Sequence, residues 1–166
     1  MPDDLPRKGS DPKGPDYDDD FYAWTQHQAA VLREMPVADN RFDREHVAEE
    51  IEDLGKSHRD VVRSQARRII EHLLKLQYSP APDPRYDWIG SIVDARIEID
   101  DKITRTIRHE VETELGRLYR QAKKQAGLSL LQYGEQEIID RLPADCPYTF
   151  DQLLEEDWYP EPMGAK

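Results

Sequence analysis

The sequence predicts an all-α protein, an elongated helical bundle built on a long antiparallel helical hairpin, with an N-terminal helix and short C-terminal helices. Two long segments, 44–78 and 88–126, repeat apolar residues at the three- and four-residue spacing of one helical face. Between them lies the proline-rich segment 79–87, which cannot continue a helix. No segment alternates apolar and polar residues with the two-residue period of a strand.

The first helix is expected at about residues 20–35. Three acidic residues, 18–20, precede its apolar positions, and carboxylates there cap free N–H groups and interact favourably with the helix dipole. Pro36 ends the helix. Residues 1–16 contain four prolines, two glycines and seven charged side chains, so they bury too little apolar surface to offset the entropy of ordering. We expect them to form a disordered arm.

The second helix is expected from Arg44 to Tyr78. Its weak point is Gly55, because glycine inside a helix costs roughly 1 kcal/mol relative to alanine. Whether the helix bends there is left open. The third helix, 88–126, is expected to end at Gly127, where glycine can adopt a left-handed C-terminal conformation.

Two short helices are expected to complete the chain. The first lies at about residues 135–142. The pair Thr149 and Gln152 predicts a capping box that opens the second, near residues 150–156. The whole segment 17–160 is expected to form a single helical domain, followed by a flexible tail at 161–166.

Charge is distributed unevenly along the second helix. Residues 43–54 carry six acidic and one basic side chain, whereas residues 56–75 carry six basic and two acidic ones. With a hairpin turn centred near residue 83, an antiparallel neighbour places Glu45 near Arg120 and Arg67 near Glu98. We expect such pairs to select the register of the hairpin, each contributing only about 0 to 1 kcal/mol.

Overall charge restricts the classes of partner. The chain has 23 Lys and Arg against 35 Asp and Glu, a formal net charge of −12, which repels phosphate backbones and anionic lipid surfaces. Neither nucleic acid nor a membrane is therefore expected as a partner. No long uncharged apolar segment or signal peptide is found, and the single cysteine excludes an intramolecular disulfide. These features predict a cytoplasmic protein.

One cluster of side chains suggests chemistry. His46, Glu49, Glu50 and Asp53 occupy positions i, i+3, i+4 and i+7, on one side of a helix. Imidazole and carboxylate groups are ligands for divalent metals, and His72 or His109 from elsewhere in the bundle would complete such a site. The same residues also lie in the first turns of a helix, where the dipole alone favours acidic side chains.

The familiar catalytic motifs are missing from the sequence. It contains no glycine-rich phosphate loop, no G-x-S-x-G, no H-E-x-x-H and no C-x-x-C. Cys146 has no neighbouring base or cation to activate its thiol, which indicates buried packing. Trp24 and Trp88 lie on apolar helical faces and Trp158 follows an acidic stretch, so all three are interpreted as packing anchors. The sequence therefore favours a protein that is not an enzyme.

Five blocks of sequence occur in order across about residues 18–160: DDDFYAWTQHQAAVLRE, HVAEEIEDLGKS, EHLLKLQY, YRQAKKQAGL and CPYTFDQLLEEDWYP. Together they resemble the bacterial domain-of-unknown-function family 29, whose members are small all-helical bacterial proteins without an established activity. The matched positions include residues that we interpret as structural anchors: Phe21, Trp24, Gly55, Trp88, Tyr119, Gly127, Cys146 and Trp158.

This chain departs from the family pattern in its third helix. Relatives tend to have a proline-containing break where this sequence reads Thr104 to Ile107, so the helix is expected to run straighter here. The stretch from Ser129 to Leu142 also looks longer than the usual link.

Three hypotheses for function remain open. The leading one is a non-enzymatic interaction or regulatory module that binds another protein, a basic one in particular, or a second copy of itself. The second is a metal-dependent hydrolase in which the predicted cluster binds a divalent metal, the only cofactor considered, and supplies a general base. The third is that Glu49, Glu50, His72 and Lys75 form a polar network that only specifies helix packing.

Overall fold

The computed structural model describes residues 13–163, and this part of the chain contains helices and no strand. The predicted all-α class is confirmed. The chain divides into two compact units, and the division falls within one helix, after Gly55. A single domain over 17–160 stays a prediction. Of the predicted disordered arm, residues 1–12 lie outside the described residues, and residues 13–16 form no helix.

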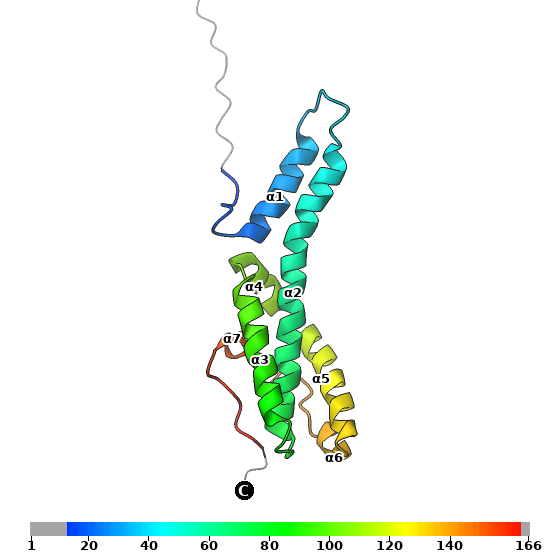
Figure 1. The fold of residues 1–166 in the computed structure, drawn as a ribbon, viewed down its shortest axis with the longest axis vertical. Helices are drawn as coiled ribbons and strands as arrows, with labels where there is room; N and C mark the ends of the chain where they lie inside the picture. Colours follow the sequence, from blue (N-terminus) through cyan, green and yellow to red (C-terminus); the bar gives the residue numbers. More distant parts are fainter. Residues whose placement is uncertain (1–12, 164–166) are drawn as a thin grey trace, which may run out of the picture. The chain divides into compact units, whose positions relative to one another are not determined.

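The first unit contains α1 (Phe21–Glu34) and the beginning of α2 (Arg44–Tyr78). Asp20 begins α1 as predicted, since its Oδ1 accepts the Ala23 N–H at 3.0 Å. The two helical segments lie side by side and antiparallel (Figure 1). Ala29 and Ala48 are fully buried, and small side chains of this kind let helices approach closely.

Helix α2 has the predicted bounds and continues through Gly55. At its C-terminal end, the guanidinium of Arg85 donates to the carbonyls of Leu76 at 2.9 Å and Ser79 at 3.3 Å. These bonds satisfy carbonyls that a helix end leaves without an intrahelical partner. The side chain of Arg85 therefore ties the start of the next helix to the end of α2.

The predicted tail, 161–166, is held at Met163. Its backbone N–H donates to the Gln77 carbonyl at 2.7 Å. The chain is thus attached to the end of α2 as far as residue 163, and residues 164–166 lie outside the described part.

The predicted single helix over 88–126 is wrong. Three helices occupy this region and extend beyond it: α3 (Arg85–Asp100), α4 (Arg105–Thr113) and α5 (Leu115–Gln132). Thr104 breaks the run, because its Oγ1 accepts the Ile107 N–H at 3.2 Å and begins α4. The expectation of a straighter helix was also wrong, since a threonine N-cap interrupts the helix without any proline.

The predicted end at Gly127 is wrong as well. Gly127 is buried inside α5, where a Cβ atom would lie 3.7 Å from Cγ2 of Ile139 in α6 (Gln136–Ile139). The helix ends instead before Gly134, which has a positive φ of 73°. The N–H of Glu135 donates back to the Leu130 carbonyl at 3.0 Å, as in a Schellman-type ending.

The last helix, α7 (Phe150–Leu154), starts with the predicted capping box. The Gln152 N–H donates to Thr149 Oγ1 at 3.2 Å, and the Thr149 N–H donates to Gln152 Oε1 at 2.9 Å. This prediction succeeded because both bonds are local to four consecutive residues.

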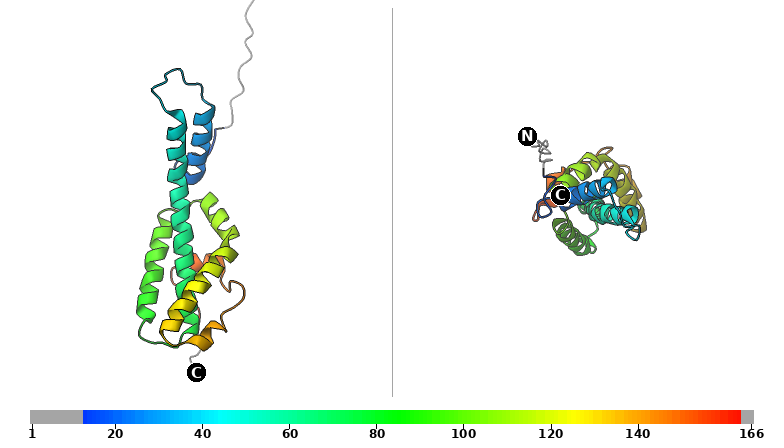
Figure 2. Two further views of the ribbon diagram at one scale, coloured as in Figure 1. Left: turned by 90° about the vertical axis from the view of Figure 1, so that its right-hand side faces the viewer. Right: turned by 90° about the horizontal axis from the view of Figure 1, so that it is seen from above.

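In the second unit, α3 and α5 lie on either side of the C-terminal part of α2 (Figures 1 and 2). Antiparallel α2 and α3 form the predicted hairpin. The largest fully buried apolar side chains come from all of its long helices and from α7: Val62, Ile69, Ile70, Leu73, Leu74, Ile92, Ile99, Ile107, Tyr119, Leu130, Phe150 and Leu153.

Opposite charges do meet in the fold, with partners other than those predicted. Arg63 of α2 pairs with Glu114, at the junction of α4 and α5. Glu98 accepts from Gln65 at 2.5 Å rather than from Arg67, and Glu45 pairs with Arg33 at 3.1 Å rather than with Arg120. The predicted register assumed one unbroken third helix, and the breaks around α4 change which side chains face α2.

Candidate functional site

The predicted metal-binding cluster lies on the first part of α2. The side chains of His46, Glu49, Glu50 and Asp53 are all exposed. His46 Nδ1 lies 2.6 Å from Oδ2 of Asp43, which raises the pKa of His46 and lowers the pKa of Asp43. At the helix start, this pair also places a carboxylate where the dipole favours negative charge.

His72 does not belong to the same unit as this cluster. It lies in the part of α2 that forms the second unit. Among residues 13–163, no group of three or more His, Cys, Asp or Glu side chains is arranged to hold a metal ion. The metal site stays a prediction, and the described geometry supplies no support for it.

His72 instead lies half-buried on α2, near the charged side chains of Lys75 and Glu71. Lys75 is only 4% exposed, and its Nζ bonds Glu71 Oε1 at 2.9 Å and lies 5.5 Å from the centre of the Trp88 ring. Burial, helped by the nearby positive charge of Lys75, lowers the pKa of His72 to about 4. The four-residue network of the third hypothesis stays a prediction, since Glu49 and Glu50 are exposed and belong to the other unit. Glu71, which sequence reasoning missed, is four residues before Lys75, the spacing of a helical ion pair.

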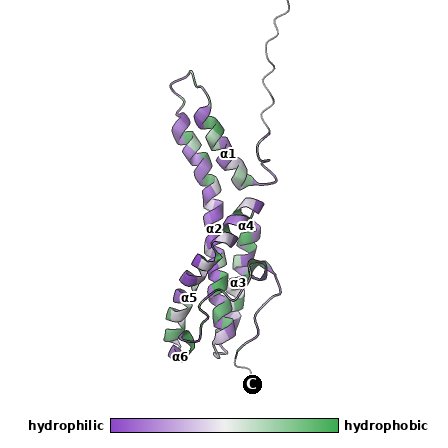
Figure 3. Ribbon diagram, turned by 180° about the vertical axis from the view of Figure 1, so that it is seen from behind, coloured by the Kyte–Doolittle hydropathy of each residue, from purple (hydrophilic) through white to green (hydrophobic). Residues whose placement is uncertain are grey.

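The feature that stands out on the first unit is an apolar stripe beside the predicted cluster. Val47, Ile51 and Leu54 follow one another at helical spacing, and Val47 and Leu54 are 37% and 52% exposed. With His46 and Glu50 they line an open depression of about 450 Å³. Figure 3 shows the alternation of hydrophobic and hydrophilic turns along this part of α2.

Helix α1 covers a different side of α2. Ala48 is fully buried there, and Gln26 Nε2 of α1 donates to the Glu52 carbonyl at 3.0 Å. Arg33 of α1 pairs with Glu45 at 3.1 Å and with Glu52 at 2.6 Å. Both carboxylates are therefore paired within the hairpin, and the one guanidinium offsets one of their two charges.

Helical geometry places Glu50 on the other border of the stripe, away from Ala48 and Glu52. Within the described part of the chain, no ion pair engages Glu49 or Glu50. We name the set Val47, Ile51, Leu54, His46 and Glu50 the α2 face. The charged residues of the α2 face and the apolar periodicity of this helix were visible in the sequence, but periodicity alone does not say which face another element covers.

The predicted aromatic anchors of the first unit contact one another. The rings of Phe21 and Trp24 are stacked at 6.1 Å, and Tyr17 lies edge-on to Trp24 at 4.9 Å. Gly55, also predicted as an anchor, is buried against Thr25 of α1, where a Cβ atom would overlap the threonine hydroxyl.

The anchors of the second unit join distant parts of the chain. The Tyr119 hydroxyl donates to the Pro143 carbonyl at 2.6 Å, and burial raises the pKa of Tyr119 to about 12. Cys146 is half-buried, its Sγ donates to the Tyr148 carbonyl at 3.4 Å, and burial raises the pKa of its thiol. Trp158 meets the Tyr148 ring edge-on at 5.9 Å. A thiol with a raised pKa is a weak nucleophile.

Sequence analysis missed Arg96, which holds the C-terminal segment. Arg96 of α3 is 8% exposed, and its guanidinium donates to the carbonyls of Leu153 at 2.9 Å, Glu156 at 2.7 Å and Trp158 at 2.9 Å. The signal available in the sequence was an arginine in register with the apolar positions Ile92 and Ile99 of one helix.

Comparison with known proteins supports the sequence resemblance. The family model described as "Domain of unknown function DUF29" matches residues 17–159. The chain belongs to the DUF29 family. A solved structure similar to this chain is that of an alpha-helical protein of unknown function from Rhodospirillum rubrum. It is 27% identical and superposes with a TM-score of 0.77, covering 87% of this chain and 92% of that chain. No curated protein matches the chain.

Within residues 13–163 of this DUF29 chain, no helix combines the length and the apolar composition that crossing a membrane requires.

Proposed function

We propose that this DUF29 chain is a non-enzymatic interaction module that binds a basic amphipathic helix of another protein on the α2 face. The observation that carries the proposal is the exposed stripe of Val47, Ile51 and Leu54 with the carboxylate of Glu50 on its border. An apolar stripe beside acidic groups complements a helix that carries apolar residues flanked by lysine or arginine.

The size of the face sets the expected strength of the complex. From Val47 to Leu54 the stripe spans eight residues, a rise of roughly 10 Å, which matches about two turns of a partner helix. Burying apolar surface contributes about 25 cal/mol per Å², whereas interfaces below about 1,200 Å² are typically transient. The proposed complex is therefore weak and reversible, as suits a regulatory contact.

Electrostatics supports a basic partner over other partners. The chain carries a net charge of −12, which accelerates encounter with a positively charged protein and disfavours nucleic acid and anionic lipid. Arg33 pairs with both Glu45 and Glu52, whereas Glu49 and Glu50 have no ion pair within the described residues, so these two carboxylates are left to attract a basic partner. The proposal places the protein in the cytoplasm, where the single thiol of Cys146 stays reduced.

The proposal is tested with a synthetic helix as probe. A fluorescent 15-residue peptide with leucine at helical spacing and lysine elsewhere is titrated with the full chain, and its anisotropy is followed. Leu54→Ser and Glu50→Lys are each expected to weaken binding about tenfold, because they remove apolar contact and reverse charge. The matched controls Leu128→Ser on α5 and Glu112→Lys on α4 are exposed residues away from the α2 face, and these variants keep the affinity.

Three outcomes would overturn the proposal. If a peptide with glutamate in place of every lysine binds as tightly as the lysine peptide, charge plays no part in the interaction. Unchanged affinity of Leu54→Ser and Glu50→Lys would remove the α2 face as the site. A homodimer that Leu54→Ser dissociates, seen by sedimentation, would identify a second copy as the occupant.

A further inference from the structure

A row of basic and apolar side chains runs along the exposed side of α5. Its members follow one another at intervals of three or four residues, and all are exposed: Arg117, Arg120, Lys124, Leu128 and Leu131. Residues at this spacing lie on one side of a helix. We name this set the α5 row. Arg117 pairs with Glu114, whereas no ion pair within the described part of the chain engages Arg120 or Lys124.

A second row with the same spacing runs along the exposed side of α3 to its C-cap. Its members, which we name the α3 row, are all exposed: Asp87, Gly90, Asp94, Glu98 and Asp101. Apolar side chains border the row, since Val93, Ile97 and Tyr86 are 41%, 57% and 85% exposed. Arg96 is buried against the carbonyls of the C-terminal segment, so its charge lies outside the row.

The two rows are complementary when the two helices are antiparallel. One register then opposes three pairs of unlike charge: Arg117 with Asp101, Arg120 with Glu98, and Lys124 with Asp94. Between residues 13 and 163, no Lys, Arg or His side chain forms an ion pair with any of these three carboxylates, so their charges are not offset. The match extends over both rows because their intervals are the same.

The same register also matches the shapes of the two helices. It places Leu128 opposite Gly90, where a Cβ atom would meet nothing within 4 Å. Tyr86 and Val93 lie on either side of this open position along α3. A glycine between larger side chains forms a hole that accepts a side chain from a neighbouring helix.

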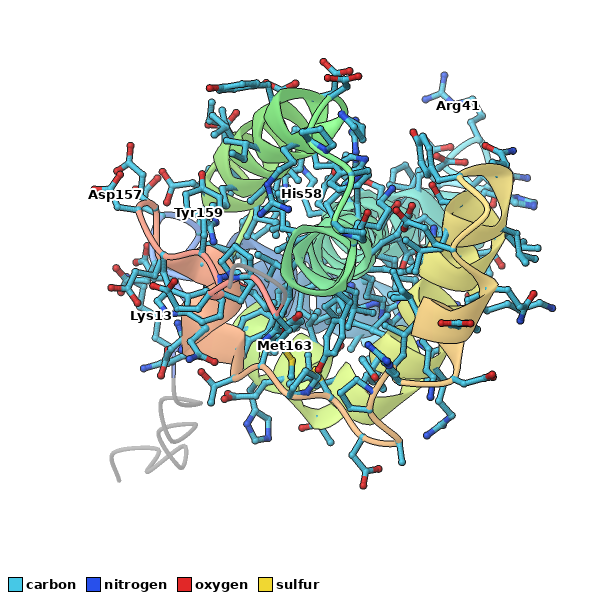
Figure 4. All side chains as sticks on the ribbon, turned by 90° about the horizontal axis from the view of Figure 1, so that it is seen from below. Lys13, Arg41, His58, Asp157, Tyr159 and Met163 are labelled. Atoms are coloured by element: carbon cyan, nitrogen blue, oxygen red, sulfur yellow. The ribbon has the colours of Figure 1, made fainter. Side chains whose placement is uncertain are left out.

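The two rows of a single copy do not face each other. Both helices belong to the unit formed by residues 56–166, and they lie on different sides of α2 with side chains extending outwards (Figure 4). A second copy of the chain is therefore needed to bring an α5 row to an α3 row.

We propose that this protein self-associates, with the α5 row of one copy docked antiparallel on the α3 row of a second copy. Such a contact joins two different surfaces and is heterologous. The α5 row spans 15 residues, a rise of roughly 21 Å, and one pair of helices of this length buries less than the about 1,200 Å² of a stable interface. Exposed charge pairs add little affinity. The association is therefore weak and depends on concentration.

Sedimentation equilibrium of the full chain at about 0.15 M salt measures the association constant. The Debye length is then about 8 Å, so the net charge of −12 repels a second copy weakly, while charges in contact still interact. Leu128→Ser is expected to weaken self-association about tenfold. The matched control Leu54→Ser removes a leucine of similar exposure, 52% against 58%, from the other unit, and is expected to keep the association constant within about twofold.

Exchange of charges identifies the register. Lys124→Glu and Asp94→Lys are each expected to weaken self-association about tenfold, because each places like charges opposite one another. Combined in one chain, the two substitutions restore unlike charges and return the association constant to within about threefold of wild type. The combination of Lys124→Glu with Asp87→Lys has the same net charge, but position 87 is roughly 10 Å along the helix from position 94. This control is expected to associate as weakly as Lys124→Glu alone.

Three results would overturn the proposal. The first is a chain that stays monomeric up to about 1 mM. The second is a double variant, Lys124→Glu with Asp94→Lys, that associates no better than either single variant. The third is a loss of association in Leu54→Ser equal to that in Leu128→Ser, which would place the contact in the other unit. Peptide binding at the α2 face is measured with dilute, monomeric chain, so failure of either proposal leaves the other standing.

Discussion

Gly55 of α2 lies so close to Thr25 of α1 that a Cβ atom at position 55 would overlap the threonine hydroxyl oxygen. Thr25 is fully buried, and its hydroxyl donates to the Tyr22 carbonyl at 2.7 Å, so it cannot move away without losing that bond. This contact explains a glycine inside a helix of 35 residues, where glycine costs about 1 kcal/mol relative to alanine.

Replacing Gly55 by alanine is expected to destabilise the packing of α1 on α2. Overpacking costs roughly 1 to 3 kcal/mol, against about 1 kcal/mol gained in helix propensity. Hydrogen exchange of the α1 amides and urea unfolding measure the difference. In the control Gly90→Ala, a Cβ atom meets nothing within 4 Å, so that variant is expected to gain about 0.5 to 1 kcal/mol. The same response from both variants would disprove the close-contact explanation.

The two glycines near the end of α5 are expected to respond in opposite directions. Gly134→Ala destabilises by roughly 1 to 2 kcal/mol, because position 134 has a φ of 73°. Gly127→Ala is neutral or stabilising, since its Cβ would make an ordinary contact of 3.7 Å with Ile139. Thermal unfolding monitored by circular dichroism compares them. A larger loss of stability in Gly127→Ala than in Gly134→Ala would indicate that the helix ends at Gly127 after all.

Arg96→Lys is expected to release the C-terminal segment. Lysine keeps the charge but cannot direct several N–H groups at the carbonyls of Leu153, Glu156 and Trp158 together. The expected loss of stability is roughly 2 to 4 kcal/mol, because buried carbonyls are left without donors. Limited proteolysis within residues 152–160 reports the release. Arg105→Lys, at an exposed position, serves as the control. If both variants resist proteolysis within residues 152–160 equally well, Arg96 does not anchor this segment.

His72 is expected to make stability depend on pH. Burial lowers its pKa from 6.5 to about 4, so the folded protein keeps the imidazole neutral while the unfolded chain takes up a proton below pH 6.5. Stability therefore falls as pH decreases from 6.5 towards 4, and is unaffected by this group above 6.5. Urea unfolding of wild type and His72→Gln across that window measures the difference. Parallel pH profiles for the two proteins would show that His72 does not titrate in this way.

Short-range patterns were sufficient for much of the secondary structure. The N-cap at Asp20, the bounds of α2 and the capping box of Thr149 and Gln152 all follow from residues within a few positions of each other. The family was also recognisable from sequence blocks. The prediction of one continuous helix over 88–126 failed at Thr104, where one hydroxyl cap outweighs an otherwise uninterrupted apolar pattern.

The candidate sites needed contacts between distant residues. Local spacing identified the charged residues near Glu50 and the apolar positions near Leu54, but could not say that α1 would cover a different side of α2 and leave these residues exposed. Nor could it say that Arg96 would hold carbonyls almost 60 residues away, or that the α3 row and the α5 row would both stay exposed. Helical periodicity and caps are local properties of the chain. Which apolar faces are buried, and which charges stay uncompensated, depends on the elements that pack against them in three dimensions.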